Sequence, residues 1–246
     1  MRSRSVLDQQ VDSMPRRVQV ELLDELPGDD PRAVRSRRDL QRINGLMGSA
    51  SILLRALDGY AGAPPTQLVE LGSGDGRLLL QVARARCKAW PGVQLSLVDR
   101  QPCVSAETLA EFHALGWPTR VLALDVFEWL AQAQTAPVDV VMANLFVHHF
   151  EGERLHQLLD GIARRCRSFV CNEPRRSPVA LIGSHLLGLI GCNAITRHDA
   201  VLSVHAGFSG SELSALWPRA PGLEWQLHER AAGIFGHLFV ATQSTC

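Results

Sequence analysis

The feature that most constrains the fold of this 246-residue chain is a glycine-rich turn between a short apolar run and a helical run. Residues 67–71 read as a buried strand, and residues 78–85 read as a helix. Between them Gly72, Gly74 and Gly76 stand at alternate positions, where the backbone can turn tightly and a ligand can lie against the main chain. The first N–H groups of the following helix then point at that ligand. The turn therefore predicts a ligand-binding strand–loop–helix unit.

The spacing of the glycines argues against a dinucleotide site. Glu70 and the three glycines form the pattern Glu-x-Gly-x-Gly-x-Gly. A dinucleotide-binding loop carries Gly-x-Gly-x-x-Gly instead, because its backbone must approach a pyrophosphate. We therefore expect the loop to bind a different kind of ligand.

Polar residues end the next three apolar runs. Asp99 ends the second run, roughly 20 residues beyond the loop, where an acid at a strand end reaches ribose hydroxyls. A carboxylate only accepts hydrogen bonds, and two adjacent hydroxyls offer two donors. The third run ends at Asp125 and the fourth at Asn144. Because ligands bind outside the carboxyl ends of parallel strands, these residues and the loop are expected on one rim of the sheet.

On these residues the sequence resembles class I S-adenosylmethionine-dependent methyltransferases, with the glycine loop as their motif I. The resemblance implies S-adenosylmethionine as the cofactor, with Glu70 steadying the loop, Asp99 on the ribose and Asp125 on the adenine. The residues that it places at the cofactor are Glu70, Gly72, Ser73, Gly74, Gly76, Asp99, Arg100, Asp125, Val126 and Asn144.

The alternation of strands and helices predicts an α/β fold, with a mostly parallel sheet covered by helices on both faces. An antiparallel last strand would match the seven-stranded, Rossmann-like sheet of the class I methyltransferases. The predicted strands are 67–71, 93–98, 119–124, 138–143, 168–172, 223–227 and 234–241. The predicted helices are 77–88, 103–116, 126–134, 152–166, 179–190 and 209–216, the last with Ser209 as its cap. Residues 191–207 are predicted to be a loop.

Residues 1–64 are predicted to form a helical N-terminal cap, and residues 65–246 the cofactor-binding domain. Apolar residues at helical spacing predict helices over 18–26 and 35–57. In the enzymes that the chain resembles, such helices commonly form a lid over the site. A helical layer packed on the edge of the sheet is the alternative.

Composition narrows the class of protein and its partners. The formal net charge is zero, without the basic excess typical of a nucleic-acid surface. The six cysteines include no C-x-x-C pair, which argues against a zinc site and a disulfide framework and favours the reducing cytoplasm. No signal-peptide stretch begins the chain, and the most apolar window is too short to span a membrane. We expect a small-molecule substrate and leave an oligomer open.

Two segments could supply a catalytic base. His148 follows the fourth strand, next to the expected position of the sulfonium, and resembles the base of small-molecule O-methyltransferases. It departs from their pattern because His149 stands where an acid would follow. His198 and Asp199 are the second pair, since from a loop they could reach one acceptor from different sides. In both cases a structural role is the alternative.

The resemblance extends, more loosely, to bacterial methyltransferases that tailor polyketides and phenols. This looser resemblance rests on residues 172–176 and on the apolar run 179–190. The apolar run is either buried or lines an apolar pocket. We therefore expect O-methylation of a hydroxylated aromatic or lipophilic small molecule. C-methylation of a quinone precursor and a non-catalytic cofactor-binding scaffold are the alternatives. No metal requirement is expected, because an acid cluster after the fourth strand, as in catechol methyltransferases, is absent.

Overall fold

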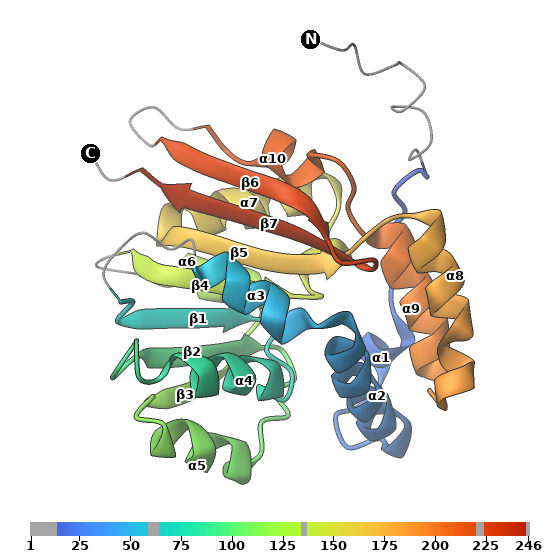
Figure 1. The fold of residues 1–246 in the computed structure, drawn as a ribbon, viewed down its shortest axis with the longest axis horizontal. Coiled ribbons are helices and arrows are strands. Elements are labelled where there is room, and N and C mark those ends of the chain that lie inside the picture. Colours follow the sequence, from blue (N-terminus) through green and yellow to red (C-terminus); the bar gives the residue numbers. More distant parts are fainter. Residues whose placement is uncertain (1–13, 59–63, 134–136, 220–223, 245–246) are drawn as a thin grey trace.

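The computed structural model describes residues 14–58, 64–133, 137–219 and 224–244. Its centre is a seven-stranded sheet in the order β3–β2–β1–β4–β5–β7–β6 (Figure 1). Strands β1 to β5 pair in parallel, and β7 runs antiparallel to both of its neighbours. The mostly parallel sheet with an antiparallel last strand is therefore confirmed. The strands are β1 Gln67–Leu71, β2 Gln94–Asp99, β3 Thr119–Ala123, β4 Val138–Asn144, β5 Cys166–Pro174, β6 Trp225–Ala232 and β7 Gly236–Gln243.

Helices cover both faces of the sheet and the carboxyl ends of its parallel strands (Figure 1). The α-helices are α1 Leu22–Glu25, α2 Pro31–Met47, α3 Ser49–Asp58, α4 Arg77–Arg86, α5 Ala106–Ala114, α6 Val126–Ala131, α7 Gly152–Arg165, α8 Pro178–Leu186, α9 Ala194–Ala206 and α10 Glu212–Leu216. The described residues also include the 3-10 helices η2 Val147–His149 and η3 Leu187–Ile190.

Successive strand residues point to opposite faces, so each strand contributes to two hydrophobic cores. In β1, Val69 and Leu71 pack on the face covered by α6, α7 and α10, with Trp129, Leu158 and Phe169 among the buried residues. Leu68 lies on the other face, in the core beneath α3, α4 and α5. Because both faces are buried, the central strands read as continuous apolar runs in the sequence.

Four helices, α1, α2, α8 and α9, gather at the carboxyl ends of the parallel strands (Figure 1). Each of the three longer ones has a side chain that caps its first turn: Asp30 for α2, Ser177 for α8 and Asn193 for α9. Of the predicted N-terminal cap, α1 and α2 pack against α9, whereas α3 packs on the sheet beside α4. Residues 1–13 of that cap lie outside the described residues.

Two predicted segments differ from the structure at the N-terminal side. Only Leu22–Glu25 of 18–26 is helical, because the chain before it is extended and lies along α9, where Arg17 N–H donates to the His205 carbonyl. The predicted helix 35–57 begins earlier, at Pro31, and is divided at Gly48, which adopts a left-handed conformation that ends α2.

Two predictions near the C-terminal side were also wrong. The predicted loop 191–207 is mostly the helix α9, whose residues show little helical amphipathicity because several sides of it are in contact with protein. Ser209 does not cap α10, since Ser211 occupies the N-cap position and the Ser209 hydroxyl accepts a hydrogen bond from Arg176. The apolar run 179–190 forms α8 and η3, and Ile182 and Leu189 on its outer side are exposed.

Among the described residues, no helix combines the length and the apolar character needed to cross a bilayer.

The close approach of α9 to β5 gives a prediction about stability. A Cβ on Gly207 would lie 2.2 Å from the Pro174 carbonyl oxygen, a backbone atom that cannot move aside cheaply. Gly207→Ala is expected to lower the free energy of unfolding by about 1–3 kcal/mol or more. Gly45, exposed within α2 with open space around it, is the matched control. Gly45→Ala should raise stability by about 0.5–1 kcal/mol. Denaturant unfolding of both variants checks this, and equal stabilities would contradict it.

Candidate active site

The glycine-rich loop has the left-handed backbone that its sequence predicts. Gly72, Gly74 and Gly76 have φ values of +66°, +53° and +71°, which side chains with a Cβ rarely adopt. Gly72 is required for a second reason, because a Cβ there would lie 2.3 Å from the ring of Phe146. The loop therefore brings β1 and the segment after β4 into direct contact.

The predicted cofactor residues gather around one pocket of about 830 Å³. This glycine-loop pocket falls within the usual range for ligand sites. All of the predicted residues except Gly76 line it; Gly76 instead holds the N-cap position of α4. Asp99 also shapes the loop, since its two carboxylate oxygens accept from the N–H groups of Gly74 and Gln101, each at 2.8 Å. Asp125 caps α6 with one oxygen and faces the pocket.

Two buried polar atoms beside the loop have no hydrogen-bond partner among the described residues. They are Oε2 of Glu70 and the hydroxyl of Ser73. Burial, with Asp75 and Asp99 nearby, raises the pKa of the Glu70 carboxyl well above its usual range. Unsatisfied buried polar groups cost free energy, so a ligand with hydrogen-bonding groups at this end of the pocket would be favoured.

Helix α2 contributes residues to the glycine-loop pocket that were not predicted from the sequence. Asn44 accepts a hydrogen bond from Asn144 at 3.1 Å, and Asn144 in turn accepts one from Asn172 at 2.9 Å. Gln41 donates to Asp75 in the loop. These contacts join α2 to the ends of β1, β4 and β5. Periodicity in a helix marks its apolar face, whereas these are polar positions with no motif of their own.

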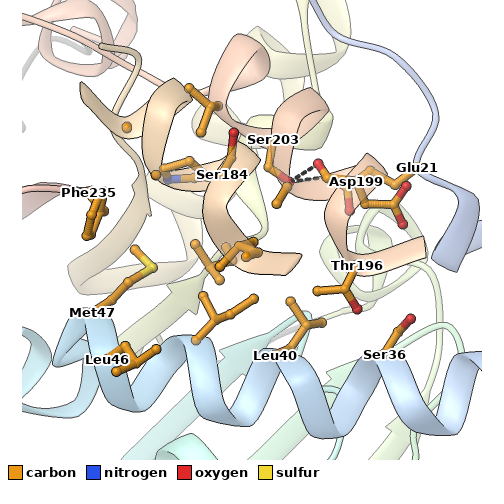
Figure 2. Close-up of a pocket in the computed structure, with 18 of the residues that line it drawn as sticks. Glu21, Ser36, Leu40, Leu46, Met47, Ser184, Thr196, Asp199, Ser203 and Phe235 are labelled. Atoms are coloured by element: carbon orange, nitrogen blue, oxygen red, sulfur yellow. Dashed lines mark hydrogen bonds between the residues drawn. The ribbon is translucent and has the colours of Figure 1, made fainter. Parts of the chain in front are cut away.

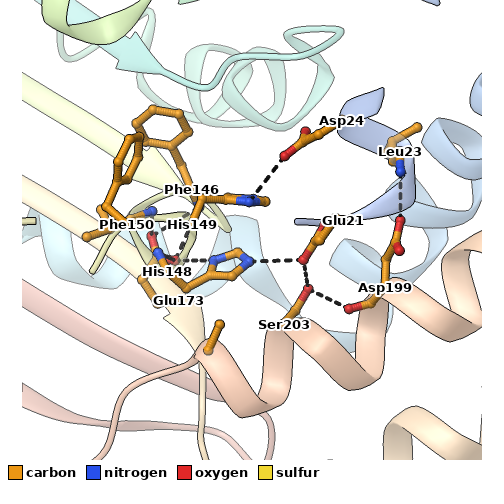
Figure 3. Close-up of polar contacts among 12 residues, drawn as sticks. Glu21, Leu23, Asp24, Phe146, His148, His149, Phe150, Glu173, Asp199 and Ser203 are labelled. Atoms are coloured by element: carbon orange, nitrogen blue, oxygen red, sulfur yellow. Dashed lines mark hydrogen bonds and ion pairs between the residues drawn. The ribbon is translucent and has the colours of Figure 1, made fainter. Parts of the chain in front are cut away.

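A buried carboxylate and a buried imidazole form the centre of the site. Nδ1 of His148 lies 2.8 Å from Oε2 of Glu173, and both side chains are at most 2% exposed. Glu173 also accepts from the backbone N–H groups of Phe146, Val147 and His148. The carboxylate of β5 thereby fixes the turn η2 and the orientation of the His148 ring. Figure 3 shows this arrangement.

The N-terminal segment brings two more acids to the histidine pair (Figure 3). Oε1 of Glu21 lies 3.4 Å from Nε2 of His148, and Oδ2 of Asp24 lies 3.4 Å from Nδ1 of His149. The first distance is longer than a normal hydrogen bond, so Nε2 of His148 makes an ion pair but no hydrogen bond with a described residue. Ser203 donates to Glu21 from α9.

These neighbours change the proton affinities of the two imidazoles in opposite directions. Burial alone would lower the pKa of His148, but Glu173 and Glu21 outweigh it and raise the pKa to about 9. Burial and the charge on His148 lower the pKa of His149. Burial alone would raise the pKa of Glu21. The two histidines and Ser203 outweigh burial, so the pKa of Glu21 is lowered overall. The site therefore contains one strongly basic imidazole and one that favours its neutral form.

A second, apolar pocket adjoins the first (Figure 2). Leu40, Leu46 and Met47 reach it from α2, and α8 and α9 form its other walls. The polar side chains of its inner wall are bound within the protein: Ser184 donates to the Leu181 carbonyl, and Thr196 to Asp39. The residues that line both pockets are Glu21, Leu23, Leu40, Leu145 and Ser203.

Leu145 marks the junction of the two pockets with an unusual backbone. Its φ of +53° is the only positive value among the described residues other than glycine. A left-handed leucine is uncommon, and such strain is concentrated at functional sites. Its N–H donates to the Asn172 carbonyl at 2.9 Å, which holds the strand end in this shape.

The structure separates the second candidate pair, because Asp199 lines the apolar pocket and His198 does not. His198 is half-exposed on α9 and lines neither pocket. Asp199 accepts from the N–H groups of Leu22 and Leu23, each at 2.9 Å, and so anchors α1. His148, which follows β4, lines the glycine-loop pocket. Glu21, Asp24 and Glu173 had no assigned roles, because only the folded chain brings these distant segments together.

No protein-family model and no curated protein sequence matches the chain. The similarity of this chain to known proteins is found among solved structures. The plantazolicin methyltransferase BamL, in complex with a triazolic desmethylPZN analog and SAH, aligns with a TM-score of 0.59 and 9% identity over 90% of this chain and 92% of that protein. An O-methyltransferase family protein from Burkholderia thailandensis aligns with a TM-score of 0.56 and 18% identity over 89% of this chain.

This chain spans 61% of the Burkholderia protein's length. Magnesium protoporphyrin IX methyltransferase from Synechocystis PCC 6803, with bound SAH, aligns with a TM-score of 0.52 and 13% identity, covering 81% of this chain and 84% of that one. At these identities the likeness concerns the fold. Together with the strand order and the reversed last strand, it shows that this chain has the class I methyltransferase fold.

Proposed function

We propose that the protein is an S-adenosylmethionine-dependent methyltransferase that methylates a hydroxyl group of a lipophilic small molecule. One observation carries the proposal. The His148 imidazole, held by Glu173, lies beside the junction of the glycine-loop pocket and the apolar pocket. A cofactor in the first pocket and an acceptor in the second would meet at this imidazole.

The glycine-loop pocket has the chemistry that the cofactor needs. The unpartnered atoms of Glu70 and Ser73 offer hydrogen bonds to the zwitterionic methionine end. Asp99 and Asp125, at the ends of β2 and β3, are the residues for the ribose and the adenine. When bound, S-adenosylmethionine supplies an electrophilic methyl group on a positively charged sulfur. Arg100, Val126 and Asn144 complete the lining around it.

His148 is the base in this proposal. Because the pKa of His148 is raised to about 9, only its neutral form can act as the base, and turnover should increase as the pH rises toward 9. In that form Nε2 accepts the hydroxyl proton of the acceptor, while Glu173 on Nδ1 holds the ring in one orientation and stabilises the imidazolium that results. Glu21 faces the same nitrogen and adds a second negative charge. Much of the remaining rate enhancement comes from alignment of the acceptor oxygen with the methyl group.

The walls of the apolar pocket favour a particular shape of acceptor. Because Ser184 and Thr196 are already hydrogen-bonded within the protein, the inner part of the pocket offers few groups to a polar ligand. The polar end of the acceptor would then lie at Glu21 and His148, and its apolar part along α2 and α8. Phenols that carry an alkyl or aryl substituent have this shape.

The alternatives are C-methylation of a quinone precursor and a non-catalytic scaffold. Labelled methyl transfer to a panel of phenols, alkylresorcinols and quinols distinguishes them. A product labelled on oxygen supports the proposal, and one labelled on a ring carbon supports C-methylation. Cofactor binding with no transfer to any member of the panel would favour the scaffold.

Replacement of Asp99 tests the cofactor site. Asp99→Asn keeps the shape of the side chain but removes the charge and one acceptor, so that the ribose hydroxyls and the loop compete for a single oxygen. We expect the Kd for S-adenosylmethionine to rise by about 10- to 100-fold, as loss of a charged hydrogen bond predicts. Isothermal calorimetry measures this, with Asp160→Asn, in an exposed ion pair on α7, as the control. An unchanged Kd would overturn the ribose assignment.

Replacement of His148 tests the base. His148→Gln should lower kcat by roughly 10²- to 10⁴-fold, the contribution of a general base, with little change in cofactor affinity. His198→Gln, on the half-exposed side chain outside both pockets, should leave kcat unchanged. The assay uses the acceptor found in the panel. Full activity of His148→Gln would mean that alignment alone accounts for catalysis.

Glu173 is expected to affect both the fold and the reaction. Four donors converge on its carboxylate, and a glutamine would turn an amide N–H₂ toward some of them. Glu173→Gln should lower the free energy of unfolding by on the order of 3 kcal/mol, the cost of breaking a buried pair. The exposed Glu153→Gln should change it by less than about 0.5 kcal/mol. Denaturant unfolding compares the two, and an unchanged free energy of unfolding in Glu173→Gln would mean that the buried pair does not stabilise the fold.

A further inference from the structure

Glu21, His148 and His149 form a compact set of metal-ligand groups beside the glycine-loop pocket. One carboxylate oxygen and one nitrogen from each ring lie within 4.8 Å of one another. The two imidazoles lie side by side, with 4.3 Å between their centroids. The sequence prediction considered only acids after β4, whereas here the acid comes from the segment just before α1.

Each histidine has a carboxylate beside one of its ring nitrogens, as metal-binding histidines usually do. Glu173 lies on Nδ1 of His148 at 2.8 Å, and Asp24 lies 3.4 Å from Nδ1 of His149. A carboxylate on one ring nitrogen leaves the other, Nε2, available to an ion and makes it a better ligand. Glu173 therefore fixes the ring of His148 through a hydrogen bond, whereas Asp24 is an ion-pair neighbour of His149.

The Nε2 atom of His148, which is in an ion pair with Glu21 but makes no hydrogen bond with a described residue, is an independent sign of a ligand. This side chain is 2% exposed, and its Nε2 has no hydrogen-bond partner among the described residues. Its distance of 3.4 Å to Oε1 of Glu21 matches the separation of about 3.4 Å between two ligands of a tetrahedral ion with bonds near 2.1 Å. Small shifts of the two side chains would place an ion between them.

We propose that Glu21, His148 and His149 bind one divalent transition-metal ion of the zinc class, with the fourth position open to water. Two imidazoles and one carboxylate suit Zn²⁺, whereas Mg²⁺ and Ca²⁺ prefer sets made of oxygens. The ion would bind the lone pair of His148 Nε2. In the proposed reaction the same lone pair accepts the hydroxyl proton. Zinc occupancy and general-base catalysis therefore exclude one another, and zinc inhibits methyl transfer.

The binding test uses the untagged full chain, freed of metal with a chelator and desalted. Zn²⁺ is titrated in competition with a chromophoric chelator, with neither cofactor nor acceptor present. We expect one tight equivalent per chain, and affinity at least about 10-fold weaker in Asp24→Asn, which removes charge from an outer partner. His149→Gln and Glu21→Gln should lose the tight equivalent. His156→Gln, exposed on α7, is the matched control and should keep it.

Thermal unfolding keeps the test valid if a variant folds poorly. Zn²⁺ should raise the Tm of the wild type and of His156→Gln, since an ion that binds only the folded state stabilises it, and should not raise that of His149→Gln. Absence of a tight equivalent in the wild type, or equal affinity in His149→Gln, would overturn the site.

The inhibitory role rests on the proposed function and has its own readout. In the labelled-methyl assay, Zn²⁺ should reduce turnover, and a chelator should restore it. Stimulation by Zn²⁺, with binding intact, would overturn the inhibitory role and the assignment of His148 as base, but not the metal site. Failure of the binding test with an active enzyme would overturn the site alone.

Discussion

The site depends on the hydrogen bonds that the buried carboxylate of Glu173 accepts. This carboxylate accepts hydrogen bonds from three consecutive backbone N–H groups of the segment after β4 and from the His148 ring. A carboxylate with this many donors remains stable in a dry interior, whereas an unpaired one would not. The same group thus joins β5 to η2 and orients the imidazole. Removal of its charge would therefore affect both the fold and the proposed chemistry.

The other half of the site is brought by the chain before the sheet. Asp199 accepts from two N–H groups of α1 and so fixes the short segment that carries Glu21 and Asp24 to the histidines. Helix α2 adds Asn44, which is hydrogen-bonded to Asn144 at the end of β4. The N-terminal elements therefore contribute residues to the site in addition to covering it. Their Glu21 contributes to the raised pKa of His148, and their Asn44 is hydrogen-bonded to the end of β4.

The parts predicted from the sequence are those encoded locally. The glycine loop, the acids at the ends of β2 and β3 and the alternation of strands follow from motifs and periodicity within a few residues. Glu21, Asp24 and Glu173 lack such a signal, because their roles arise only when three distant segments meet. The helix α9 was missed for a related reason. With protein on several sides, it shows no single apolar stripe, so periodicity did not distinguish it from a loop.

The apolar run 179–190 shows how hydropathy alone leaves two interpretations open. One side of α8, with Ala180 and Gly183, lines the apolar pocket, while Ile182 on another side is exposed. The polar groups of the pocket also have partners inside the protein, as Ser184 and Thr196 do. A polar substituent placed there would lose its water without gaining a partner, at a cost of about 1–3 kcal/mol per group. Selection among acceptors would therefore act by exclusion. The pocket would accept many apolar shapes and reject a second polar group, so specificity for one hydroxyl would arise from the single position where His148 and Glu21 can receive it.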